Sequence, residues 1–296
     1  MPKERSQSLS NRTKILFAII IVVLMVSYGL AMIYPQHPSL ATPSPSSFTP
    51  SDWMSFIPSN VTYFRFLNVS FLAQYPLLFE DPLILSFSPN LFNITVANVT
   101  YGVDLQANNA INVTIIGLND QSLTFVSNAL ASANLTSTVY NNVTLYRLEQ
   151  NPTGVDGPAW VCIVRGVMVL GQGDLLAEQA LQSIIDASPA TFFNNDQLKV
   201  GYLLTWGGEK TFAFSYYQSG DNNYSVDWEM HSATNGSVIT DRYSYHFPSA
   251  EVLSNKYDDA KKNLFFDAKA VYTSGSFMVG DFSFLQSEVR TALGII

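Results

Sequence analysis

The stretch AWVCIVRGVMVLGQGDLLAEQALQSII, residues 159–185, carries the clearest structural signal in this chain. Two apolar runs, Trp160–Val164 and Val167–Leu170, flank Arg165-Gly166, a pattern that predicts a hairpin buried on both faces. A helix is expected directly afterwards. Asp174 is its predicted N-cap, and the following apolar residues recur at helical spacing: Leu175, Leu176, Ala180, Leu181, Ile184 and Ile185.

The C-terminal end of the chain repeats this plan. Placing Gly166 on Gly275 aligns two hairpins without a gap, at a constant offset of 109 residues. The same offset places Asp174 on Ser283 and predicts a second helix that contains Phe284, Leu285, Val289 and Leu293. The repeat indicates two related halves. Chance agreement of two ordinary hairpin–helix units is the alternative.

The apolar spacing and turn residues in the rest of the chain predict an α+β fold, with a mostly antiparallel sheet and helices packed on one face. Turn signals support it: Asn141-Asn142 between short apolar runs predicts a two-residue hairpin. Asn119 and Ser249 are predicted to cap helices over 120–133 and 249–263. Further strands are expected at Val61–Leu67, Ile111–Ile116, Thr211–Tyr217, Tyr224–Ala233 and Val238–Phe247.

Asn235-Gly236 is the strongest hairpin signal, because both residues of a type I′ turn need positive φ. A two-residue turn at this position fixes the register of the flanking strands. Trp228 is then expected opposite Tyr243, and Glu229 opposite Arg242 as an ion pair.

That register gathers the candidate catalytic or metal-binding residues of the chain on one strand face: Asp227, Glu229, His231 and His246. Carboxylates and imidazoles so placed could bind a divalent ion or activate water. The alternative is a solvated sheet face without a site. No other nucleophile, phosphate-binding or heme-attachment motif occurs in the sequence, so we expect neither a metal nor another cofactor.

The apolar run Ile15–Ile33 predicts a transmembrane helix, since about 19 residues rise ~28 Å and the hydrocarbon core is ~30 Å thick. Lys3, Arg5, Arg12 and Lys14 precede it and favour a cytoplasmic N-terminus. A cleaved signal peptide is the alternative, since Gly29-Leu30-Ala31 resembles a cleavage site. Under either interpretation, the rest of the chain is expected to be exported.

The predicted organisation has five parts: a cytoplasmic tail (1–14), a signal-anchor helix (15–34), a Pro/Ser/Thr-rich stalk (35–52) and two α+β subdomains (53–198 and 199–296). Beyond the anchor, Asn-X-Ser/Thr glycosylation sequons occur at nine positions: Asn60, Asn68, Asn93, Asn98, Asn112, Asn134, Asn142, Asn223 and Asn235.

Composition narrows the possible partners. The chain has a formal net charge of −8, and only 13% of its residues are charged. Without clustered Lys and Arg, nucleic acid is not an expected partner. Cys162 is the only cysteine, so no intrachain disulfide is possible. Its apolar neighbours in the sequence predict that its side chain is buried in the core. Sequons, an anchor and no disulfides together suggest an archaeal surface protein.

These features favour a non-enzymatic, membrane-anchored module, either an envelope component or an accessory subunit of a membrane complex. Its expected partners are the lipid bilayer, through residues 15–33, and other membrane or envelope proteins. Two alternatives remain. One is an exported hydrolase or metal-binding enzyme that uses Asp227, Glu229 and His231, and the other is a surface receptor for a small ligand.

Overall fold

The computed structural model describes residues 38–49, 51–74, 94, 96–107, 111–149, 157–173, 175–187, 192–208, 211–218, 226–234 and 238–285. Leu40–Ile296 forms one compact unit, and Met1–Ser39 forms another. The expected transmembrane segment, residues 15–33, lies outside the described residues. Among the residues described, no helix is both long enough and apolar enough to cross a membrane.

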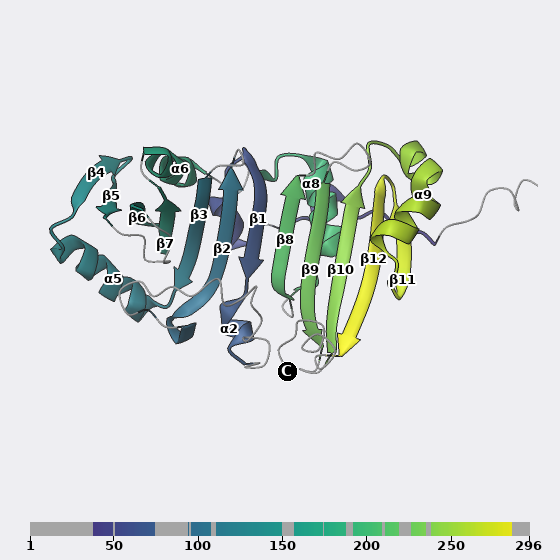
Figure 1. Cartoon of the computed structure of the whole chain (residues 1–296), viewed down its shortest axis with the longest axis horizontal. Coiled ribbons are helices and arrows are strands. Elements are labelled where there is room, and N and C mark those ends of the chain that lie inside the picture. The colour runs from purple at the N-terminus through teal and green to yellow at the C-terminus, as the bar shows by residue number, and fades with distance from the viewer. Residues whose placement is uncertain are drawn as a thin grey trace, which may run out of the picture. The chain divides into compact units, whose positions relative to one another are not determined.

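The strands of the described chain form one 12-stranded antiparallel sheet, which confirms the α+β class (Figure 1). Its order from edge to edge is β11 (Ala270–Ser274), β12 (Phe277–Leu285), β10 (Val238–His246), β9 (Val226–Thr234), β8 (Thr211–Gln218), β1 (Val61–Leu67), β2 (Val99–Ala107), β3 (Ile111–Leu118), β7 (Val167–Gln172), β6 (Ala159–Val164), β5 (Val143–Leu148) and β4 (Thr136–Tyr140).

The same order of elements occurs twice along this sheet. Strands β1–β3 form a meander, helix α5 (Asp120–Ser132) follows, and β7 of a later hairpin returns to pair with β3. Strands β8–β10 form a second meander, helix α9 (Ala250–Leu264) follows, and β12 returns to pair with β10. The first strands of the two series, β1 and β8, pair in the middle of the sheet.

The predicted alignment of the two hairpins is off by one residue. Arg165 and Gly275 each take the first turn position, because Val164 opposes Val167 and Ser274 opposes Phe277. The helix predicted to begin at Ser283 is also wrong, since residues 283–285 continue β12. Pairing along the full length of β10 supplies hydrogen bonds that override the helical spacing of the side chains. Residues 286–296 lie outside the described part.

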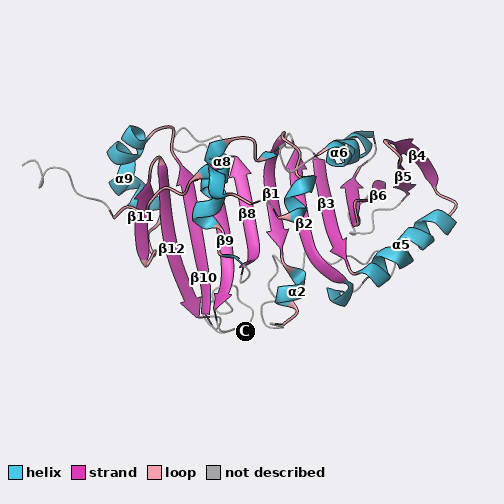
Figure 2. Ribbon diagram, turned by 180° about the vertical axis from the view of Figure 1, so that it is seen from behind, coloured by secondary structure: helices cyan, strands magenta, loops and turns pink. Residues whose placement is uncertain are grey.

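Helices cover both faces of the sheet, so the expectation of one covered face is wrong. Helices α6 (Leu175–Asp186) and α8 (Asp196–Thr205) lie on one face, here called the α8 face (Figure 2). Helices α2 (Val69–Leu72), α5 and α9 lie on the opposite α5 face (Figure 1). Both faces need cover because β6 and β7 are buried at nearly every position, as their continuous apolar sequence predicts.

Two predicted hairpin turns and two predicted helix caps are confirmed. Arg165 and Gly166 have φ of 48° and 80°, and Asn141 and Asn142 have φ of 45° and 64°, so both hairpins close through residues with positive φ. Asn119 and Ser249 cap α5 and α9, each accepting a backbone N–H three residues later. The N-cap predicted at Asp174 lies outside the described residues.

The segment from Leu40 to Phe48, expected to be part of a free stalk, packs on the sheet unit. The backbone N–H of Leu40 donates to the carbonyl of Thr273 at 2.8 Å, and the Ser274 hydroxyl donates to Thr42 Oγ1 at 3.0 Å. Further along, Phe48 stacks on Phe193 at 4.9 Å between ring centroids. Aromatic contact therefore fixes a stretch that its Pro and Ser content predicted to be unfolded.

Candidate functional site

The hairpin of β9 and β10 has a register one residue away from the predicted one. Trp228 opposes Ser244 and Glu229 opposes Tyr243, and the last paired residues are Thr234 and Val238. The connection therefore spans residues 235–237 in place of the predicted two-residue turn. Side chains alternate between the two faces of a strand. A shift of one residue therefore changes which residues of β9 and β10 share a face of the sheet.

The slip separates His246 from the other three residues of the predicted acid/base cluster. His246 opposes Val226 and shares the α8 face with Trp228, while positions 227, 229 and 231 oppose the alternate residues Tyr245, Tyr243 and Asp241. The expectation that all four share one face is wrong. Among the described residues, no group of three or more His, Cys, Asp or Glu side chains is placed to hold a metal ion.

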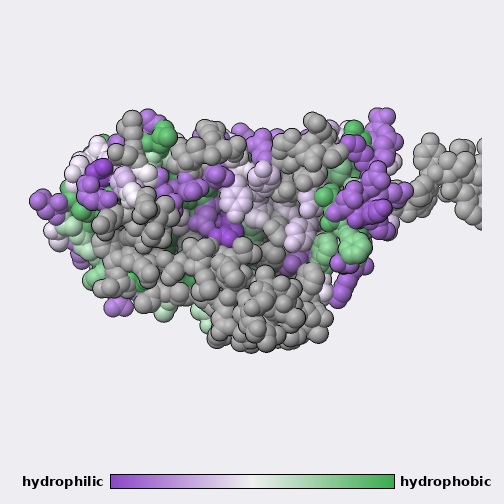
Figure 3. Space-filling model, viewed as in Figure 1, coloured by the Kyte–Doolittle hydropathy of each residue, from purple (hydrophilic) through white to green (hydrophobic). Residues whose placement is uncertain are grey.

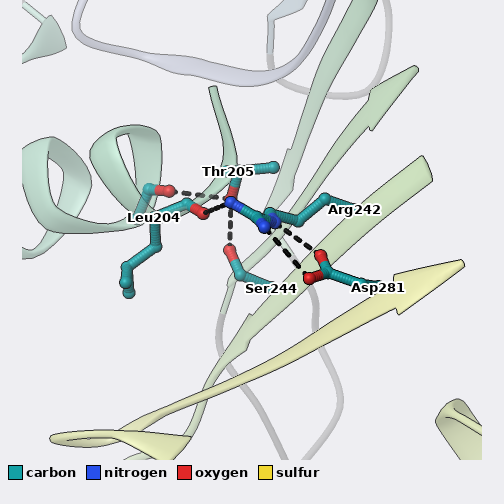
Figure 4. A network of polar contacts seen from close by, with 6 residues as sticks. Leu204, Thr205, Arg242, Ser244 and Asp281 are labelled. Carbon is teal, nitrogen blue, oxygen red and sulfur yellow. Dashed lines mark hydrogen bonds and ion pairs between the residues drawn. The ribbon is translucent and has the colours of Figure 1, made fainter. Parts of the chain in front are cut away.

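Arg242, predicted to pair with Glu229, pairs with Asp281 of the neighbouring strand β12 (Figure 4). Its Nε and Nη2 atoms donate to the two carboxylate oxygens at 2.6 and 3.0 Å, and Nη1 donates to the carbonyl of Leu204 at 3.4 Å. Hydrogen bonding to Asp281 raises the pKa of Arg242. One guanidinium thus joins two strands to the C-terminal end of α8, where a cation is favourable.

A second polar contact fixes the same end of the helix. Thr205 Oγ1 donates to the carbonyl of Gly201 at 2.8 Å and lies 2.6 Å from Ser244 Oγ on β10 (Figure 4). Both hydroxyls are fully buried, so the mutual hydrogen bond avoids the cost of leaving them without partners. These contacts position α8 on the sheet.

A cavity of about 230 Å³ lies on the α8 face between the start of α8 and the sheet. Five strands contribute to its floor, and its wall comes from the chain before β1, from the segment that leads into α8 and from the first turn of α8. The lining residues are Ser59, Val61, Phe192, Asn195, Gln197, Leu198, Tyr216, Gln218, Trp228, His246 and Phe277. This cavity is a candidate binding site in the described part of the chain.

Strand register brings the floor residues together. Tyr216 opposes Trp228, and in the next row His246 opposes Phe277 across β10 and β12. The rings of Tyr216 and Trp228 are 4.7 Å apart between centroids, and Phe192 meets Tyr216 edge to face at 4.9 Å. The aromatic rings of the floor therefore pack against one another, and Trp228 and Tyr216 are only 1% and 4% exposed.

The lining of the cavity carries no formal charge. No Asp, Glu, Lys or Arg is among its lining residues. Burial lowers the pKa of His246, whose ring lies 4.7 Å from that of Phe277, so the imidazole is uncharged at neutral pH. The polar groups in the wall are amides and a hydroxyl, which recognise ligands by hydrogen bonds and do not supply acid or base catalysis.

Sequence reasoning missed this site because it missed α8. The signal was present: Asn195 precedes the helix, and its side chain accepts the backbone N–H of Gln197 at 2.8 Å. The floor was missed for a different reason. The register error placed Trp228 beside Tyr243 and placed His246 beside the carboxylates.

Cys162 takes no part in the cavity. Its side chain is fully buried in β6, and burial raises the pKa of the thiol to about 12. The thiolate is therefore scarce at neutral pH, which excludes a nucleophilic role. The side chain belongs to the core of the α8 face, as its apolar surroundings in the sequence predicted.

No protein-family model matches this chain, and no curated protein matches it in sequence. Among solved structures, the chain is similar to one described as "Structure of crystal form I of TP0453", with a TM-score of 0.48 and 11% sequence identity. The similarity covers 83% of this chain and 97% of that chain. We transfer neither function nor site residues from this likeness.

Proposed function

We propose that this protein is a membrane-tethered, N-glycosylated extracytoplasmic module of an archaeal cell surface. In this proposal it has no catalytic activity of its own. It acts as an envelope component or as an accessory subunit of a membrane protein complex. Residues 15–33 anchor it in the bilayer, with the N-terminus in the cytoplasm.

The observation that carries the proposal is the exposure of the sequons. Four sequon asparagines in the described residues are exposed and lie in turns, loops or at a strand start: Asn60, Asn112, Asn134 and Asn142. Asn68 and Asn98 are partly exposed. A glycan needs a surface position, and these six asparagines meet that requirement. Positions 93, 223 and 235 lie outside the described residues.

Ion pairs between neighbouring strands support a structural role for this protein. Arg65 donates to Asp104 at 3.0 Å across β1 and β2, and Thr114 donates to the same carboxylate at 3.0 Å. This cluster lies on the α5 face, where hydrophilic residues appear over β1 and β2 (Figure 3). Together with Arg242 and Asp281, it shows charged residues linking strands of the sheet.

The packed stalk supports a position close to the membrane. If residues 15–33 span the bilayer, only residues 34–39 separate the span from the compact unit that begins at Leu40. Six extended residues reach about 20 Å at most. A module held this near the bilayer is in place to contact the extracytoplasmic parts of membrane proteins.

Of the two alternatives, the exported hydrolase was expected to use Asp227, Glu229 and His231, and these positions still alternate along β9 on one face of the sheet, while His246 lies on the other face. The ligand-binding receptor gains a specific observation, the neutral cavity on the α8 face. Binding a small ligand is compatible with an accessory or envelope role, so the two can coexist.

Expression in an archaeal host that glycosylates proteins tests the proposal. We expect the chain in the membrane fraction, with glycopeptides at the four exposed sequons. Asn134→Gln should remove the mass of one glycan, while Asn128→Gln, an exposed asparagine of α5 outside any sequon, should leave the mass of the glycans unchanged. Native electrophoresis in mild detergent should show a band larger than the glycosylated monomer. An unglycosylated chain in the soluble fraction would contradict the proposal.

A further inference from the structure

The two edges of the sheet differ in what covers them. At the β11 edge, the backbone N–H of Leu40 donates to the carbonyl of Thr273, so the chain that precedes β1 contacts that strand. At the opposite edge, β4 is the last strand, and no other strand of the described chain pairs with its outer side (Figure 1). An open edge presents unpaired N–H and C=O groups to any strand that approaches it.

The hairpin geometry identifies the unpaired groups of β4. Tyr140 opposes Val143 across the two-residue turn, and such a closing pair exchanges both of its backbone hydrogen bonds. Because bonded and non-bonded pairs alternate along an antiparallel ladder, the N–H and C=O groups of Ser137 and Val139 point away from β5. Both residues are exposed, Val139 to 68%. The outer side of β4 therefore offers donors and acceptors to another strand.

β4 lacks the features that usually protect an edge strand. Its sequence, Thr-Ser-Thr-Val-Tyr, includes no charge and no proline, and its pairing with β5 has no bulge. No charged residue occurs between Asp120 and Arg147 in the sequence. The hairpin is also held in place, since the Tyr140 hydroxyl and the Asn141 amide donate to Asp186 at 2.6 and 2.9 Å. An ordered, uncharged edge of this kind is prone to pair with other strands.

The strand that this edge fits is β4 of a second copy. In an antiparallel pair with Thr138 opposite itself, Ser137 of each copy bonds to Val139 of the other, and both copies use all of their unpaired groups. The arrangement has two-fold symmetry, as a closed dimer requires. It brings no charges of the two strands together, and it places Asn134 of one copy near Asn142 of the other.

Glycosylation sequons stand at both ends of the same edge. Asn134 lies two residues before β4 and Asn142 lies two residues after it, and both residues are exposed. β4 is about 17 Å long, and a pairing strand must approach to about 4.8 Å along that length. A bulky, solvated glycan at each end occupies space that the second copy needs. No sequon follows Asn235, so the covered β11 edge has none beside it in the sequence.

We infer that glycans on Asn134 and Asn142 shield the β4 edge and prevent two copies of this chain from pairing there. The inference rests on the proposed function for the presence of the glycans and adds what these two glycans do. The protein then covers the two edges of its sheet in different ways, by its own chain at β11 and by glycans at β4. Without these glycans, two copies pair through β4.

Disulfide crosslinking of the unglycosylated chain tests the edge. The full-length protein is made in a bacterial host that does not glycosylate, purified in detergent and oxidised with diamide. Opposed residues of a non-bonded antiparallel pair lie about 4.5 Å apart between Cα atoms, within the range of disulfides, so Thr138→Cys should link two copies. Ser183→Cys, at an exposed position of α6, is the control and should give at least tenfold less dimer on a non-reducing gel. Equal dimer from both variants would overturn the inference.

A lysine on the edge tests whether the crosslink reports strand pairing. Val139→Lys, added to Thr138→Cys, places two like charges at diagonal positions of the paired strands, and natural edge strands carry lysine for this purpose. We expect the yield of dimer to fall at least fivefold. Ser127→Lys, at an exposed position of α5, adds the same charge away from the edge and should leave the yield unchanged. A yield that Val139→Lys does not lower would contradict pairing through β4.

Expression in a glycosylating archaeal host tests the role of the glycans. The Thr138→Cys chain keeps both flanking sequons and should give at least tenfold less crosslinked dimer than the unglycosylated chain. Removing the two flanking glycans with Asn134→Gln and Asn142→Gln should restore the dimer. The matched control removes glycans from two other exposed sequons, with Asn60→Gln and Asn112→Gln, and should leave the yield of dimer low.

Mass spectrometry of the same samples separates this inference from the proposed function. Absence of glycans at Asn134 and Asn142 would overturn both. Glycans at both positions, with no more dimer after their removal, would overturn the shielding role alone and leave the glycosylated module as proposed. An equal rise in dimer in the Asn60→Gln and Asn112→Gln control would show a general loss of solubility and would also contradict a shield at β4.

Discussion

Arg242 and Asp281 form a two-pronged ion pair across β10 and β12, with Nε–Oδ1 and Nη2–Oδ2 distances of 2.6 and 3.0 Å. The same guanidinium reaches the carbonyl of Leu204 in α8. The pair therefore connects β10 and β12 to α8, the helix that forms one wall of the cavity. Side-chain exposures of 33% and 23% place it between a surface pair and a buried one.

Arg242→Lys should lower the free energy of unfolding by about 1–2 kcal/mol, because lysine cannot make the two parallel hydrogen bonds or keep the third one. Urea unfolding followed by tryptophan fluorescence measures the change. Glu149→Gln is the control, since Glu149 is 74% exposed in its pair with Arg147, and the loss should be at most about 0.5 kcal/mol. Equal losses in both variants would contradict the role assigned to Arg242.

Gly201→Ala should destabilise the protein by about 1–3 kcal/mol. A Cβ at this position would lie 2.2 Å from Trp228 Nε1, so α8 and the indole must move apart. The sign of the effect is informative, because the same change in an open helix stabilises by about 1 kcal/mol. Thermal or urea unfolding of the variant shows whether the change destabilises or stabilises the protein. A stabilised variant would contradict the close contact between α8 and the indole of Trp228.

His246 should make stability depend on pH. Burial lowers its pKa in the folded state, so as the pH falls below about 6.5 the unfolded chain binds a proton first. The free energy of unfolding then decreases from pH 7 toward pH 5. His246→Gln lacks this titration, so the stability difference between wild type and variant should shrink over that range. A difference that stays constant between pH 7 and pH 5 would show that the imidazole is not buried in its neutral form.

Cys162 should be unreactive in the folded protein. With a pKa of about 12 and no exposure, its thiol should react with a disulfide reagent at pH 8 more than 100-fold slower than in urea. Absorbance of the released thiolate measures both rates. Cys162→Ala should abolish the signal, since the chain has no other cysteine. Fast labelling of the native chain would indicate that β6 opens readily.

Local sequence signals predicted the local structure well. The hairpin at Arg165-Gly166 and the turn at Asn141-Asn142 formed where positive φ was expected, and Asn119 and Ser249 cap the helices that they were expected to cap. Each of these features depends on a few neighbouring residues and on short-range hydrogen bonds. Tertiary context had little opportunity to override them.

Long-range structure was predicted less well, and two of the errors were single-residue slips. Asn235-Gly236 predicted a two-residue turn, but β9 ends at Thr234 and β10 begins at Val238. That single extra residue moved Arg242 from Glu229 to Asp281 and moved His246 to the α8 face. The candidate site changed because the alternation of side chains turns a shift of one residue into a change of face.

The sequence by itself determined the α+β class, the burial of β6 and β7 on both faces and the caps of α5 and α9, because these follow from apolar spacing and local hydrogen bonds. Only the tertiary structure decided which residues share a face and which strands are neighbours. The cavity of Trp228, His246 and Asn195 joins segments far apart in the chain. Such a site depends on the register of many strand pairs at once, and no short stretch of sequence encodes that register.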